Sequence, residues 1–184
     1  RDRVGTRDGG QVRVVAERVA RAFSPEAFEL YLSAGWTSPP RAIPGDPGAI
    51  VLPASFADAP EPEQLFMLGR CFFRLVTGTA FVGDLPPDAL DGLLLGAVRA
   101  VVPTFAQAEL GPGRERAVAT FAPPLAKAMG RRQKKLLEEI APSMTSAFDV
   151  RPFVAGLAKS ELYAGLVASG DLLAGLEVLR REHH

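Results

Sequence analysis

Apolar side chains recur every three or four residues along most of this chain, which is the spacing of amphipathic helices. The first such helix is predicted from the apolar positions Val12, Val15, Val19 and Phe23, and it stops near Ser24-Pro25. A second is predicted over residues 61–77, where proline and acidic residues begin the segment and Gly78 follows it. The same spacing predicts further helices at about residues 87–102, 114–121, 124–141, 150–168 and 171–181.

Two short segments near the N-terminus depart from the helical spacing. The stretch FELYLS at residues 28–33 alternates in polarity, and AIVLP at residues 49–53 is continuously apolar, so both are predicted strands. The segment between them, AGWTSPPRAIPGDPG, is rich in proline and glycine and is predicted as a loop. The sequence therefore predicts an α+β fold that is mostly helical, with a small N-terminal β-sheet packed against a helical body.

The length of 184 residues and the 47% hydrophobic content suit one domain with a sizeable core. We expect that domain over residues 11–182, after a polar linker or lead-in at residues 1–10 and before a tag remnant at residues 183–184. Heavy use of alanine, glycine, arginine and proline suggests a bacterial protein. A lone cysteine in an apolar run suits a reduced thiol in the cytoplasm.

Positive and negative side chains balance, at 21 each, so neither nucleic acid nor an anionic membrane surface is an expected partner. The stretch GRRQKKLLEEI at residues 130–140 is interpreted as a solvated helix face with ion pairs Lys134-Glu138 and Lys135-Glu139. No run of about 18 uncharged apolar residues is present, so no membrane span is expected.

The stretch RCFFR places Arg70 and Arg74 four residues apart, and hence on one face of the predicted helix. Guanidinium groups stay protonated and have no lone pair for a metal. No histidine precedes residue 183, and Cys71 cannot build a zinc site by itself. The same absence removes Ser-His-Asp and Cys-His mechanisms, and no glycine-rich phosphate loop follows a predicted strand. We therefore expect no metal, no cofactor and no catalysis.

The residues around the two arginines follow a recognisable order: Glu63, QLFM, Leu68-Gly69, RCFFR and then Gly78-Thr79. This order resembles that of M48-type gluzincin metallopeptidases, of the kind attached to bacterial tetratricopeptide-repeat proteins. In their H-E-x-x-H motif two histidines bind zinc and the glutamate activates water. The resemblance implies that Arg70 and Arg74 stand at the histidines, Cys71 at the glutamate, and Thr79 where a supporting histidine is common.

The family takes its third zinc ligand from the glutamate of a later E-x-x-A-D motif. The stretch SELYAGL supplies Glu161 and Ala164, with Gly165 in place of the aspartate. A shifted alignment instead puts Ala158 at the glutamate and Leu162 at the aspartate. The motif is incomplete in either alignment, so the resemblance implies a zincin-like fold with a degenerate site.

The function implied by this resemblance is a non-catalytic pseudo-metallopeptidase domain that serves as a protein-interaction or scaffold module of a larger bacterial protein. Its partner would be another protein or an adjacent domain. Arg70 and Arg74 either pair with acids of neighbouring helices or form a clamp for a carboxylate or another anion. Trp36 either belongs to a recognition loop or packs inward over the sheet.

Two other classes of function are open at this point. The stretch YAGLVASGDLLAGLEVL has the rhythm of a tetratricopeptide helix pair, which suggests a helical adaptor without metallopeptidase ancestry. An enzyme of another type would need acid–base work by Asp84, Asp88 or Asp91. A sheet packed on the helix that carries Arg70 would favour the zincin-like fold over the adaptor.

Overall fold

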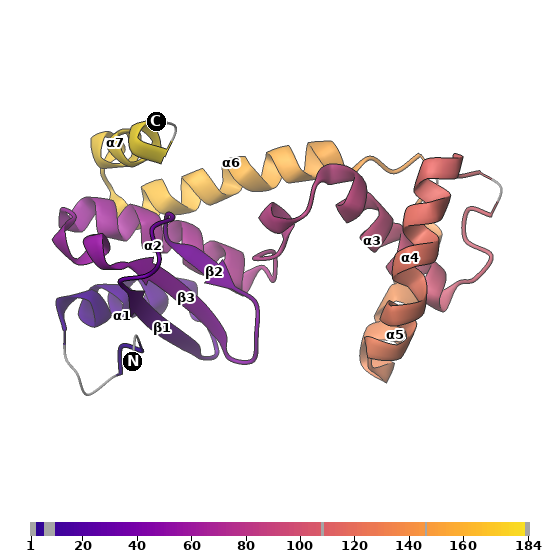
Figure 1. The fold of residues 1–184 in the computed structure, drawn as a ribbon, viewed down its shortest axis with the longest axis horizontal. Helices are drawn as coiled ribbons and strands as arrows, with labels where there is room; N and C mark the ends of the chain where they lie inside the picture. The colour runs from indigo at the N-terminus through magenta and orange to yellow at the C-terminus, as the bar shows by residue number, and fades with distance from the viewer. Residues whose placement is uncertain (1–2, 6–9, 108, 146, 183–184) are drawn as a thin grey trace. The chain divides into compact units, whose positions relative to one another are not determined.

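The computed structural model describes residues 3–5, 10–107, 109–145 and 147–182. The α+β, mostly helical fold class is confirmed (Figure 1). The elements are α1 Gln11–Phe23, β1 Phe28–Ser33, β2 Arg41–Ile43, β3 Gly48–Pro53, α2 Glu61–Val76, α3 Pro87–Val101, α4 Pro112–Ala128, α5 Arg131–Ile140, α6 Val150–Ser169 and α7 Leu172–Glu182. Short 3₁₀ turns lie at Ala54–Asp58, Val82–Asp84 and Ala141–Ser143.

The sheet has the strand order β1-β3-β2, with β1 parallel and β2 antiparallel to β3. The prediction of a loop throughout residues 34–48 was wrong at β2, which is three residues long and lies between Pro40 and Pro44. Such flanking prolines are typical of loops, and only the pairing of Ala42 with Ile50 makes the segment a strand.

Contacts between residues divide the chain into two compact units. Unit 1 comprises residues 1–81 and 156–184, and unit 2 comprises residues 82–155. The single domain expected over residues 11–182 stays a prediction. The tag remnant expected at residues 183–184 lies outside the described residues, as does most of the lead-in expected at residues 1–10.

The core of unit 1 lies where α1 and α2 pack against each other and against the sheet. Leu30 of β1, Ile50 of β3 and Phe72 of α2 are fully buried there. Phe72 stacks with Phe23 of α1 and meets the ring of Phe28 edge-on at 4.9 Å. The apolar positions predicted for both helices therefore supply one continuous core.

Unit 2 is built on the close packing of α3 and α4. The predicted helix break before residue 124 was wrong, because α4 continues through Pro123 and Pro124 and ends at Ala128. The two prolines leave the carbonyl groups of Ala119 and Thr120 without helical donors, but these residues are exposed and water can reach them. The break occurs at Gly130, whose N–H donates to Oε1 of Gln133 (2.8 Å) at the start of α5.

Gly69 of α2 marks a very close approach to α6. A Cβ atom at this position would lie 2.6 Å from Cβ of Ala168 and 2.8 Å from the carbonyl oxygen of Ala164. We expect Gly69→Ala to lower the free energy of unfolding by about 1–3 kcal/mol, because the helices would have to separate. Gly156→Ala is the matched control, since Gly156 also lies within a helix but has no such atom within 4 Å.

Urea denaturation of both variants measures this effect. The control is expected to leave stability unchanged or raise it by up to about 1 kcal/mol, as alanine favours helix. Equal stability of Gly69→Ala and the unchanged protein would contradict the close helix packing.

Candidate functional site

Arg70 and Arg74 of α2 both contact Glu161 of α6 in unit 1, and Arg70 also contacts α7. Nε of Arg70 donates to Oε1 of Glu161 (2.9 Å). Arg74 reaches the other oxygen, Oε2, through Nε (2.6 Å) and Nη2 (2.5 Å). One carboxylate of α6 is therefore shared between two guanidinium groups of α2.

Small side chains explain why α6 approaches α2 so closely. Glu161, Gly165 and Ala168 share one face of α6, because they are four and three residues apart. A Cβ at Gly165 would lie 2.9 Å from the ring of Phe66, and the Gly69 contact described above lies further along the same seam. This seam brings the backbone of α6 close enough for Glu161 to reach both arginines.

Glu161 is 5% exposed, so its charge is almost fully removed from water. A buried carboxylate is tolerated when opposite charges and hydrogen bonds satisfy it, and here each oxygen accepts from a different arginine. In one alignment the family resemblance implies that Glu161 stands at the third-ligand position. The structure places it against both Arg70 and Arg74, although 91 and 87 residues separate them in the chain.

Arg70 has a second carboxylate partner, Glu182 of α7. Both oxygens of Glu182 accept from Nη1 of Arg70 at 2.8 Å. Arg70 also lies over the ring of Phe66, with its Cζ 5.6 Å from the ring centroid. Burial lowers the pKa of Arg70, but the hydrogen bonds and charge of Glu182 and the charge of Glu161 outweigh this, so the pKa is raised. Arg70 therefore remains a cation.

A further ion pair joins α7 to the start of α2. Arg181 donates to Glu63, whose side chain is only 10% exposed, whereas that of Arg181 is 53% exposed. Neither Glu182 nor Arg181 is predicted from the sequence to belong to the site. Both are charged residues at the end of a predicted helix, which usually indicates a solvated surface, so no local signal marked them.

Cys71 lies beside these arginines but takes no part in the ion pairs. It is 4% exposed, and burial raises the pKa of its thiol to about 12 despite the opposing charges of Arg70 and Arg74. The sulfur is therefore a protonated thiol at neutral pH. Metal ligation and nucleophilic attack both require a thiolate, so neither suits Cys71 here.

Thr79 lies at the end of α2 and helps to terminate it. Its N–H donates to the carbonyl of Arg74 (3.0 Å), and its hydroxyl shares a hydrogen bond with that of Thr77 (2.7 Å). These contacts explain Thr79 locally as part of a helix end.

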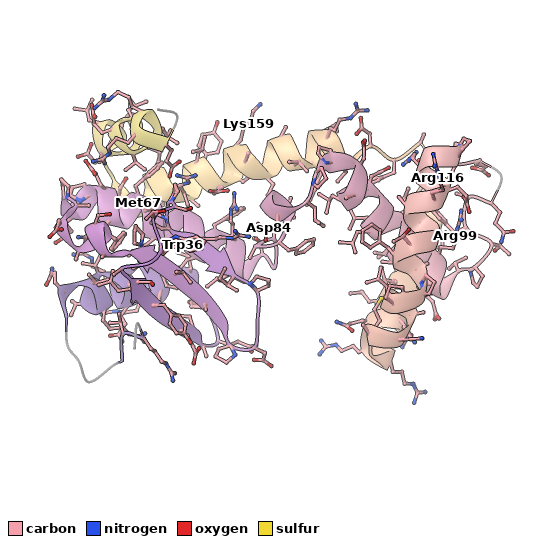
Figure 2. The ribbon with its side chains drawn as sticks, in the orientation of Figure 1. Trp36, Met67, Asp84, Arg99, Arg116 and Lys159 are labelled. Carbon is pink, nitrogen blue, oxygen red and sulfur yellow. The ribbon has the colours of Figure 1, made fainter. Side chains whose placement is uncertain are left out.

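Trp36 is half-buried in the segment before β2 (Figure 2). Its Nε1 donates to the carbonyl of Pro39 (3.0 Å), which shapes the chain at the entry to the strand.

The aspartates considered for acid–base work lie in unit 2. Of these, Asp91 is paired with Arg114 (2.6 Å). Asp88 and Asp91 both line a pocket of about 540 Å³.

Zinc, which the family resemblance implies, does not fit the donors present at Arg70, Cys71 and Arg74. Two cations and a protonated thiol face the position where lone pairs would be required. In the part of the chain that the structure describes, no three His, Cys, Asp or Glu side chains are grouped to hold a metal ion. No helix among these residues combines the length and apolar character needed to cross a membrane.

Comparison of the chain with protein-family models, curated proteins and solved structures finds no match.

Replacing Glu161 tests the shared ion pair. We expect Glu161→Gln to lower the free energy of unfolding by about 3–5 kcal/mol, because two partly buried guanidinium groups lose their common counterion. The matched control is Glu177→Gln on α7, where an exposed carboxylate pairs with Arg180 and should contribute about 0–1 kcal/mol. Chemical denaturation of both variants provides the comparison, and equal losses would contradict a structural role for Glu161.

The protonation state of Cys71 can be read from its reactivity. At pH 8 an unfolded thiol is about one quarter thiolate, whereas a pKa of about 12 leaves roughly one in ten thousand. We therefore expect labelling by a disulfide reagent such as DTNB to be slower by at least a factor of ~10³ in the folded protein than in urea. Rapid labelling of the folded protein would show an accessible, reactive thiolate instead.

Proposed function

We propose that this protein contains a non-catalytic, zincin-like pseudo-metallopeptidase domain that binds a protein partner or an adjacent domain of a larger bacterial protein. The observation that carries the proposal is the shared carboxylate of Glu161 between Arg70 and Arg74. The resemblance implies that these three residues stand at the positions of three zinc ligands, and they are in direct contact.

An ion-pair network supports this proposal because it explains how such a site could persist without metal. Zinc brings two positive charges to its ligands, and Arg70 and Arg74 together bring the same charge to Glu161. The replacement keeps the buried carboxylate neutralised while removing the two imidazole ligands that would hold a metal to activate water. The protein would keep the scaffold of a peptidase but none of its chemistry.

Packing around α2 favours this proposal over the helical adaptor. β2 and β3 contact α2 and share its core, whereas a tetratricopeptide helix pair has no sheet on its helices. The rhythm at the α6–α7 junction also has a structural explanation. Gly170 has a positive φ of 63° where α6 ends, and Oδ1 of Asp171 accepts from the N–H of Ala174 (3.1 Å) in the first turn of α7.

The proposed partner follows from charge and chemistry. Zero net charge gives no general attraction to nucleic acid or anionic lipid, so a protein surface is the expected partner. The reduced, buried thiol of Cys71 suits the bacterial cytoplasm as the compartment.

Restoring the metal site tests the proposed ancestry. We expect Arg70→His, Cys71→Glu and Arg74→His, combined in one chain lacking the two C-terminal histidines, to bind about one zinc ion, with Glu161 as third ligand. The corresponding chain with the original residues should bind none, because arginine cannot ligate zinc. Metal analysis after dialysis measures both.

Adding Glu161→Gln to the restored chain is the control, and it should weaken zinc binding by at least about tenfold. Circular dichroism establishes that each variant is folded. Stoichiometric zinc in the protein with its original residues, or a folded restored chain without zinc, would contradict the proposal.

A further inference from the structure

A pocket of about 300 Å³ lies beside the two arginines of α2. It is lined by the segment of residues 39–42, by Met67, Arg70 and Arg74, and by Glu161 and Glu182. Figure 2 labels Met67, which contributes an apolar wall. Ligand pockets typically span ~300–1,000 Å³, so this one has room for a small charged group or the tip of a side chain.

Each of the two guanidinium groups has one nitrogen whose N–H donors take no part in their ion pairs. Arg74 uses Nε and Nη2 on Glu161, and Arg70 uses Nε and Nη1 on Glu161 and Glu182. Within the described ranges of the chain, Nη1 of Arg74 and Nη2 of Arg70 have no hydrogen-bond partner. The side chain of Arg74 is 30% exposed and that of Arg70 is 19% exposed, so solvent and ligands can reach them.

The charges at the two arginines favour an anion in the place of Glu182. The guanidinium groups of Arg70 and Arg74 are balanced by the carboxylates of Glu161 and Glu182, which line the same pocket. When Glu182 moves away, one of the two positive charges is left without a counterion. Guanidinium groups with free N–H donors bind carboxylates through paired, charge-assisted hydrogen bonds.

The contact of Glu182 with Arg70 is weaker than the contacts that Glu161 makes with the two arginines. Its two oxygens share a single donor, Nη1 of Arg70, instead of meeting two nitrogens in a fork. The neighbouring contact, from Arg181 to Glu63, involves a side chain that is 53% exposed, and exposed ion pairs contribute little stability. The last turn of α7 is thus held to α2 by contacts that another carboxylate could replace.

Glu182 also lines a second pocket. This pocket, of about 490 Å³, shares Pro39, Pro40, Met67 and Glu182 with the first and extends to Phe56 and Val178. Movement of Glu182 away from Arg70 would remove the side chain that it contributes to the wall of each pocket. A partner segment could then reach the arginines with a carboxylate.

We infer that Arg70 and Arg74 form a binding site for a carboxylate of a protein partner, and that Glu182 of α7 is its built-in competitor. This inference rests on the proposed function, because it names the chemistry of the partner that the domain binds. Binding of the partner releases the last turn of α7 from α2. The carboxylate is that of an acidic side chain or of a chain terminus, since both offer the same two oxygens.

The test uses three small probes of nearly equal size and the full chain. N-acetyl-glutamate α-amide carries a side-chain carboxylate, N-acetyl-glutamine carries an α-carboxylate, and N-acetyl-glutamine amide carries none. Titrations followed by NMR at the arginine Nε–H groups give the dissociation constants. Because an internal competitor lowers apparent affinity, we expect a carboxylate probe to bind Glu182→Gln about tenfold more tightly than the unchanged protein.

Glu177→Gln on the exposed side of α7 is the matched control and should bind the probes as the unchanged protein does. Arg74→Gln should weaken binding by at least about tenfold, since it removes free donors of the site. The carboxylate probe that binds identifies the source, side chain or chain terminus.

Equal affinity of Glu182→Gln and the unchanged protein would overturn the role of Glu182. Absence of binding to Glu182→Gln, or equal binding of the uncharged amide, would overturn the carboxylate site. Failure of the proposed pseudo-metallopeptidase ancestry is detected separately, by the zinc content of the restored and original chains.

Discussion

The carboxylate of Glu161 lies in the interior of unit 1, and its two oxygens accept from two different arginines of α2. A buried charge without a partner costs several kcal/mol, so this contact constrains where α6 can lie along α2 and how it is rotated. The glycine and alanine seam between the helices permits the approach, while the ion pairs select one register within it. Arg70 extends the same network to Glu182 and hence to α7.

This network has a consequence for chemistry. Arginine differs from histidine in carrying a permanent charge and no lone pair, so the pair Arg70 and Arg74 can neutralise a carboxylate but cannot ligate a metal. Burial also keeps the neighbouring thiol of Cys71 protonated. Two guanidinium groups and a protonated thiol therefore suit contact with an anion better than ligation of a metal, and the proposed function rests on this chemistry.

The two arginines are not equivalent. Arg70 is more buried, lies over the ring of Phe66 and has two carboxylate partners, whereas Arg74 has one and is 30% exposed. Arg70 is thus mainly a connector of three helices, and Arg74 offers the more accessible donors to the pocket. The same pair is bonded to carboxylates of α6 and α7 and also lines a pocket.

The sequence by itself determined α1 and α2 and the strands β1 and β3 to within about one residue at their ends, because apolar spacing and helix-ending residues are local signals. It also placed Arg70 and Arg74 on one face, since that depends only on helical geometry. Tertiary structure decided the rest: that Arg41–Ile43 is a strand, and that Glu161 and Glu182 reach Arg70 across 91 and 112 residues. A three-residue strand and a long-range ion pair have no periodic signal of their own, because each exists only through the partner that packing brings to it.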